Sequence, residues 1–77
     1  MVMSLDEFIS RIEEEFEDLE PGTIKADSKY KQAINWTSMN ALIFIIMIDA
    51  EFGVILKDEE FSENESIAEL YSRINAK

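Results

Sequence analysis

The sequence contains no cysteine and no histidine. Without cysteine, the chain can form neither a disulfide bond nor a cysteine-ligated zinc or redox site. Without histidine, it lacks the commonest general base and the commonest metal ligand, and a Ser-His-Asp triad is excluded. We therefore expect a non-catalytic protein that is not an enzyme and has no metal site.

Basic residues, glycine and proline are also scarce. The chain has 7 Lys and Arg residues against 17 Asp and Glu residues, which gives a net charge of -10, and it has only 2 Gly and 1 Pro. The excess of acid disfavours nucleic acid and anionic membranes as partners and favours basic protein surfaces. Few Gly and Pro residues among many good helix formers predict an all-α fold.

Long hydrophobic runs are absent as well. The longest purely apolar stretch, Ala41 to Ile48, is too short to span a bilayer. The residues after Met1 lack the basic region that opens a signal peptide. We therefore expect a cytoplasmic protein without a membrane span. The 77 residues, 47% of them hydrophobic, predict one domain over residues 1–77, and we expect a monomer.

Apolar residues at steps of three and four predict a first helix from Leu5 to Leu19. Ser4 followed by Glu7 is a capping-box pattern at its start, and Glu20, Pro21 and Gly22 are expected to end it. The next segment, Glu20 to Trp36, has no firm periodicity and predicts a long first loop. Its expected anchors on the bundle are Ile24, Tyr30, Ala33, Ile34 and Trp36.

The second helix is predicted to start at Thr37 or Ser38 and to run to Phe52, with Gly53 as a left-handed C-terminal cap. This segment is apolar on more than one face, which indicates either a central position or a face that binds a partner.

A short helical turn is predicted at Asp58 to Phe61 and a last helix at Ser66 to Asn75. Ser66 and Glu69 repeat the capping-box pattern. The expected architecture is a four-helix bundle with three longer helices, one short helix and a long first loop.

The order of these elements resembles the acyl carrier protein family. That family is a small acidic four-helix bundle with a serine at the start of its second helix. The family pattern there is Asp-Ser-Leu, followed by a helix that ends in acidic residues, Phe and Gly. The matching residues are Thr37-Ser38-Met39 and Asp49-Ala50-Glu51-Phe52-Gly53, and the resemblance covers nearly the whole chain.

The resemblance implies that Ser38 carries a covalent 4′-phosphopantetheine arm, added by a phosphopantetheinyl transferase. The thiol of that arm holds acyl or aminoacyl groups as thioesters, and acyl-transferring or acyl-modifying enzymes act on them. A helix N-terminus also suits a phosphodiester on electrostatic grounds. On spacing alone, Ser38 is better interpreted as a plain helix cap, and it is the resemblance that favours attachment of the arm. Carriers of fatty acid, polyketide, peptide and envelope biosynthesis share this scaffold, and the sequence does not choose among them.

Two departures from the family pattern bear on function. Thr37 stands where the family has the aspartate that helps hold a metal ion during arm transfer. Thr37 can cap the helix but supplies no charge. The second helix also lacks most of the acidic surface residues through which basic partners recognise members of the family. An alternative is therefore a carrier-like docking module that has lost the arm, and a third reading is an unrelated acidic bundle that inhibits a basic enzyme.

Partner enzymes are expected to present docking surfaces that are both basic and apolar. The expected contact residues on the second helix are Met39, Ile43, Ile46, Met47, Asp49 and Glu51. Residues such as Phe44, Ile45, Ile48 and Leu70 would either line a hydrophobic cleft between helices that sequesters a bound chain or simply fill the core.

Overall fold

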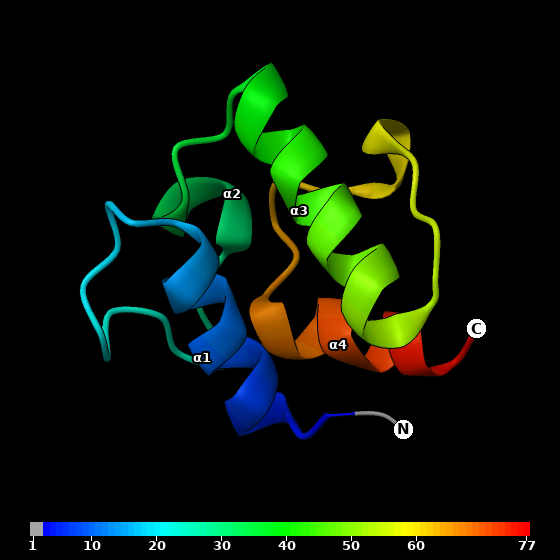
Figure 1. Cartoon of the computed structure of the whole chain (residues 1–77), viewed down its shortest axis with the longest axis horizontal. Coiled ribbons are helices and arrows are strands. Elements are labelled where there is room, and N and C mark those ends of the chain that lie inside the picture. Colours follow the sequence, from blue (N-terminus) through cyan, green and yellow to red (C-terminus); the bar gives the residue numbers. More distant parts are fainter. Residues whose placement is uncertain (1–2) are drawn as a thin grey trace.

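The computed structural model describes residues 3–77 and is helical, as Figure 1 shows. Its elements are α1 (Leu5–Glu15), α2 (Tyr30–Ala33), α3 (Ser38–Phe52), the 3-10 helix η1 (Asp58–Glu60) and α4 (Ile67–Asn75). Within the described residues the only strand-like pairing is one isolated bridge between Lys29 and Ser66. The all-α prediction is therefore confirmed.

Helix α1 begins as predicted and ends early. The Ser4 amide donates to the Glu7 carboxylate at 2.8 Å, and the Glu7 amide donates to Ser4 Oγ at 3.2 Å, which completes the capping box. The helix ends at Glu15 rather than Leu19, because Phe16 adopts an extended backbone. No basic residue lies in the last turn of α1 to offset the negative end of the helix dipole.

A carboxylate on α1 turns the following segment back. The Glu13 carboxylate accepts the backbone N–H groups of Gly22 and Ile24 at 2.8 and 3.1 Å. These bonds hold the residues after Phe16 beside the helix, so the chain cannot continue along the helix axis. Ile24 is buried, which confirms it as an anchor of the first loop.

The first loop contains one helical turn, α2, that the sequence did not predict. Tyr30 and Ile34 are buried there, as expected for anchors, whereas Ala33 and Trp36 are half-buried. The loop also reaches α4, because the Ile67 amide donates to the Ser28 carbonyl and the Ala68 amide to the Ala26 carbonyl, each at 2.9 Å.

Helices α3 and α4 follow the sequence closely. Helix α3 spans Ser38–Phe52, and Gly53 caps it with φ of 68°, in the left-handed region where glycine is at no disadvantage. Ser66 caps α4 with the predicted capping box to Glu69. The short turn is present as η1, which packs on α3.

The core is built around the ring of Phe44 on α3. Five aromatic rings from different parts of the chain lie with their centroids 5.7 to 6.4 Å from it: Phe8, Phe16, Tyr30, Trp36 and Phe61. Such pairs add to the stability gained from burial alone. Helix α1 packs against both α3 and α4 around this cluster. Across residues 3–77, no helix combines the length and the hydropathy needed to cross a membrane.

Candidate functional site

Ser38 is the first residue of α3, and Thr37 is the cap before it. The Thr37 hydroxyl oxygen accepts the Asn40 backbone N–H at 3.1 Å, so the capping role belongs to Thr37. The Ser38 side chain is exposed, and among residues 3–77 its hydroxyl makes no hydrogen bond. Its hydroxyl is therefore free to react or to bind.

The N-terminus of α3 keeps part of its capacity to bind an anion. Thr37 donates its own amide to the Asn35 carbonyl at 2.9 Å, and the Asn40 side-chain amide donates to the same carbonyl at 2.7 Å. The amides of Ser38 and Met39 have no acceptor within the described part of the chain. They point out of the positive end of the helix dipole, where an anion is stabilised.

The first turn of α3 also differs in charge from those of α1 and α4. It holds no acidic residue, whereas α1 carries Asp6 and Glu7 there and α4 carries Glu69. In those two helices the capping carboxylate accepts the amide of the N-cap residue, Ser4 or Ser66. At α3 the corresponding Thr37 amide donates to the Asn35 carbonyl, so no carboxylate from the first turn lies beside the amides of Ser38 and Met39.

Trp36 holds in place the chain segment that precedes Ser38. Its ring packs edge-on against Phe44 and Phe61 and tilted against Tyr30, with centroids 5.3 to 5.7 Å apart. The ammonium group of Lys31 lies 5.4 Å from the centre of the Trp36 ring. Trp36 therefore anchors the end of the first loop and fixes the position of the backbone that leads into Thr37 and Ser38.

The expected docking residues divide into exposed and buried ones. Met39 is 71% exposed and Ile46 is 58% exposed, while Ile43 is half-buried. Met47 is only 2% exposed, so its assignment to the docking surface is wrong. It lies three residues after Phe44 on the same side of α3 and packs into the core.

The two acidic docking residues also differ from each other. Asp49 is exposed, whereas Glu51 is half-buried and accepts a hydrogen bond from Arg11 at 3.0 Å. Glu51 therefore ties α3 to α1. Leu42 is 55% exposed on the same face as Met39 and Ile46, although it was not among the residues expected there. Leu42 lies three residues after Met39 and four before Ile46, and this spacing is the signal by which the sequence could have identified it.

The expected acyl cleft is filled by side chains. Phe44, Ile48 and Leu70 are fully buried members of the core, and Ile45 is half-buried against it. An open groove of about 530 Å³ lies elsewhere, between the end of α1, α2 and the first half of α3. Ile34 and Ile43 contribute apolar surface to it, and Glu14, Glu17 and Asp18 contribute carboxylates.

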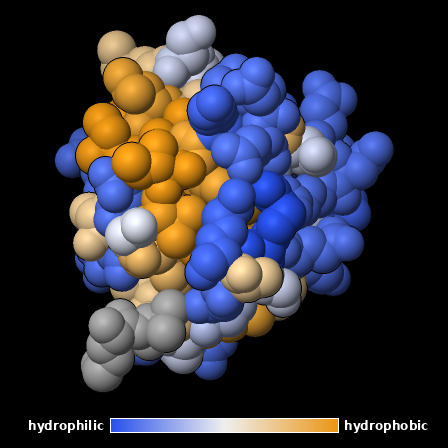
Figure 2. Space-filling view, turned by 90° about the vertical axis from the view of Figure 1, so that its right-hand side faces the viewer, coloured by the Kyte–Doolittle hydropathy of each residue, from blue (hydrophilic) through white to orange (hydrophobic). Residues whose placement is uncertain are grey.

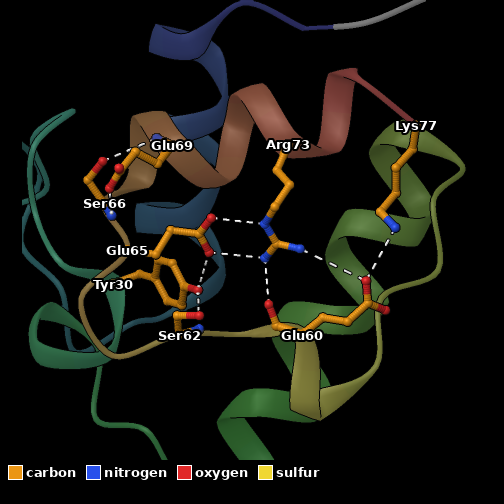
Figure 3. A network of polar contacts seen from close by, with 8 residues as sticks. All are labelled: Tyr30, Glu60, Ser62, Glu65, Ser66, Glu69, Arg73 and Lys77. Carbon is orange, nitrogen blue, oxygen red and sulfur yellow. Dashed lines mark hydrogen bonds and ion pairs between the residues drawn. The ribbon is translucent and has the colours of Figure 1, made fainter.

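A polar network missed by the sequence analysis joins α2 to α4, as Figure 3 shows. Glu65 accepts the Tyr30 hydroxyl at 2.6 Å and the Arg73 guanidinium at 2.9 and 3.0 Å. Arg73 also donates to the Glu60 carbonyl at 2.6 Å. Tyr30 lies 35 residues before Glu65 in the sequence, so no local pattern could have predicted that it joins the network.

The network shifts the acidity of two groups. Burial of Glu65 opposes its ionisation, but hydrogen bonds from Arg73 and Tyr30 and the charge of Arg73 hold its pKa below the usual range. Burial raises the pKa of Tyr30, and the hydrogen bond to Glu65 raises it further. The network is thus an ionised carboxylate held between a cation and a neutral phenol. Within residues 3–77, no cluster of three or more Asp or Glu side chains is placed to hold a metal ion.

Comparisons with protein-family models, with curated proteins and with solved structures found no match to this chain. The geometry around Ser38 and the pattern of the sequence are therefore the basis for assigning a function.

Proposed function

We propose that this protein is an acyl carrier protein that holds acyl or aminoacyl groups on a 4′-phosphopantetheine arm attached to Ser38. The observation that carries the proposal is the exposed Ser38 hydroxyl at the start of α3, beside two backbone N–H groups that find no acceptor among residues 3–77. Thr37 caps the helix, so Ser38 is not needed for that purpose. The residue that the family pattern selects is thus also the one whose hydroxyl is free.

The residues around Ser38 suit a phosphodiester. Its oxygens would accept the free amides of Ser38 and Met39, and no carboxylate in the first turn of α3 would repel them. When bound, the arm supplies a thiol for thioester chemistry, which a chain without cysteine lacks. The contribution of the chain is to present the attachment point on a rigid base formed by Trp36 and the core rings around it.

The proposal includes the family fold and its partners. A long first connection before the serine-bearing helix, and a short helical element before the last helix, support a carrier-type bundle. A phosphopantetheinyl transferase and acyl-transferring or acyl-modifying enzymes would dock on α3 through Met39, Leu42 and Ile46, with Asp49 attracting basic groups. The proposal includes a cytoplasmic location for this carrier.

Intact-mass analysis after incubation with coenzyme A and a transferase tests the attachment. We expect the wild-type chain to gain the mass of one phosphopantetheine and Ser38→Ala to gain none. Ser10→Ala is the matched control, because Ser10 is also an exposed serine on a helix and should not affect the gain. A gain that persists in Ser38→Ala would overturn the assignment of the site.

Thr37→Asp tests the missing carboxylate. Aspartate caps a helix as well as threonine does, so the free energy of unfolding should change by less than about 0.5 kcal/mol. The initial rate of loading by a transferase of broad specificity should rise, because the resemblance gives the family aspartate a role in holding the metal ion. The rate is followed by mass spectrometry, with Thr37→Asn as a control that caps without a charge. Equal rates for the two variants would contradict this role.

The second candidate function is a docking module without the arm. Thr37 in place of the family aspartate favours it, because the chain then lacks a carboxylate used in loading. If several transferases, including one from the same genome, give no mass gain on the wild-type chain, the docking module becomes the better account.

A further inference from the structure

The exposed face of α3 is an apolar stripe in a strongly acidic protein. Among residues 3–77, three of the four large hydrophobic side chains that are most exposed lie on it, with Met39 at 71%, Leu42 at 55% and Ile46 at 58%. Their spacing places them on one side of the helix. Figure 2 shows apolar surface gathered on one side of the molecule beside a broad hydrophilic area. From Ser38 to Ile48 the sequence contains no charged residue.

The stripe is self-complementary. A two-fold axis at the level of residue 44 would pair two antiparallel copies of α3, with Leu42 of each copy opposite Ile46 of the other. The same axis would place Asp49 of each copy opposite Met39 of the other. Asp49 is exposed and makes no ion pair within the described residues. It would then lie beside the free amides at the start of the other α3, where a carboxylate is stabilised.

We propose that a second copy of this chain covers the α3 stripe, forming a weak antiparallel dimer that salt strengthens. The basic partner enzymes of the proposed function would use the same residues, but the stripe offers them a single carboxylate, Asp49, at one end; in their absence a second copy covers it. The exposed side chains form a small contact, which is typical of transient association. The net charge of -10 on each copy opposes the dimer at low ionic strength. Screening by ions limits the range of that repulsion to about 8 Å at physiological salt.

The dimer would regulate the site described above. Ser38 lies at the end of the stripe, opposite Ala50 of the other copy in the antiparallel arrangement, so the dimer covers it. This consequence rests on the proposed function, because masking Ser38 matters only if Ser38 carries the arm. The dimer itself does not depend on the arm.

Sedimentation velocity on the unmodified chain tests the dimer directly. In about 20 mM salt we expect a monomer, which agrees with the monomer predicted from the sequence. In about 500 mM salt the weight-average mass should rise toward twice the monomer as the protein concentration increases. A chain that stays monomeric under all these conditions overturns the proposal.

Two substitutions on the stripe have a matched control outside α3. Leu42→Glu and Ile46→Glu should each abolish the mass increase, because they bring carboxylates together at the two-fold axis. Ile55→Glu should leave it unchanged, since Ile55 is 72% exposed but follows α3 rather than lying on the stripe. Circular dichroism checks that each variant is folded. Equal loss in Ile55→Glu would mean non-specific association and would overturn the proposal.

Charge reversal separates the local contact from net charge. Asp49→Lys and Asp27→Lys change the net charge equally, and both residues are exposed. Asp27→Lys should strengthen the dimer by reducing repulsion, whereas Asp49→Lys should weaken it several-fold by placing a cation at the other helix N-terminus. Strengthening by both variants would contradict the antiparallel arrangement. Because none of these measurements involves the arm, their failure leaves the Ser38 mass test unaffected.

Discussion

The carboxylate of Glu65 joins the first loop to the last helix. It accepts hydrogen bonds from Tyr30 of α2 and Arg73 of α4, and Arg73 also donates to the Glu60 carbonyl at the end of η1. Its side chain is only 13% exposed. A hydrogen-bonded pair at this depth is much less screened by solvent than one on the surface. Removing one member of this network leaves the others without one of their hydrogen-bond partners.

Glu65→Gln should therefore destabilise the fold and alter its response to acid. The pKa of Glu65 is lower in the folded protein than in the unfolded chain, so the carboxylate contributes stability above the usual glutamate pKa. That contribution is lost as the pH falls through the lowered pKa. We expect a loss of about 1–3 kcal/mol at pH 7 and a shallower decline in stability below about pH 4.

Urea unfolding between pH 3 and pH 7 measures both effects. Glu63→Gln is the control, because Glu63 is exposed and makes no hydrogen bond or ion pair within the described residues. It should shift the free energy of unfolding by less than about 0.5 kcal/mol. If the free energy of unfolding of Glu65→Gln falls with acid as steeply as that of the wild type, other groups control acid unfolding.

Single residues were predictable from the sequence where the contact is local. Ser4 with Glu7 and Ser66 with Glu69 form the capping boxes that their three-residue spacing predicted. Met47 was misplaced because α3 is apolar around most of its circumference, and periodicity alone cannot say which side meets the core. The packing of Phe44 among five rings decides it.

The helices themselves were predicted best where a residue fixes the end. Gly53 has φ of 68° and ends α3 where the sequence indicated, whereas nothing near Phe16 signals that α1 ends there. That end depends on Glu13 binding the amides of Gly22 and Ile24, a contact with the later loop. The single turn of α2 depends on tertiary packing of Tyr30 in the same way.

Gly53→Ala tests the cap of α3. A Cβ atom at Gly53 would meet no atom of residues 3–77 within 4 Å, so the expected cost comes from the left-handed backbone. We expect the free energy of unfolding to fall by about 1–2 kcal/mol, as measured by urea unfolding. Gly53→Asn should cost clearly less, because asparagine tolerates this conformation. Equal costs for the two variants would show that the backbone conformation is not the cause.

For the whole molecule, composition predicted the fold class and the charge, but not how the loops close. A chain of 77 residues with net charge -10 and few turn residues indicated a small acidic helical domain. The contact between the first loop and the start of α4 joins Ala26 and Ser28 to Ile67 and Ala68, about half the chain apart. Pairings at such separations leave no local signal in the sequence.

That contact has a consequence for amide exchange with solvent. The first amides of a helix have no partner within the helix and ordinarily exchange as freely as those of a loop. In α4 the amides of Ile67 and Ala68 are bonded to the carbonyls of Ser28 and Ala26. Deuterium uptake at these two positions therefore reports when the first loop lifts away, while the rest of α4 stays helical.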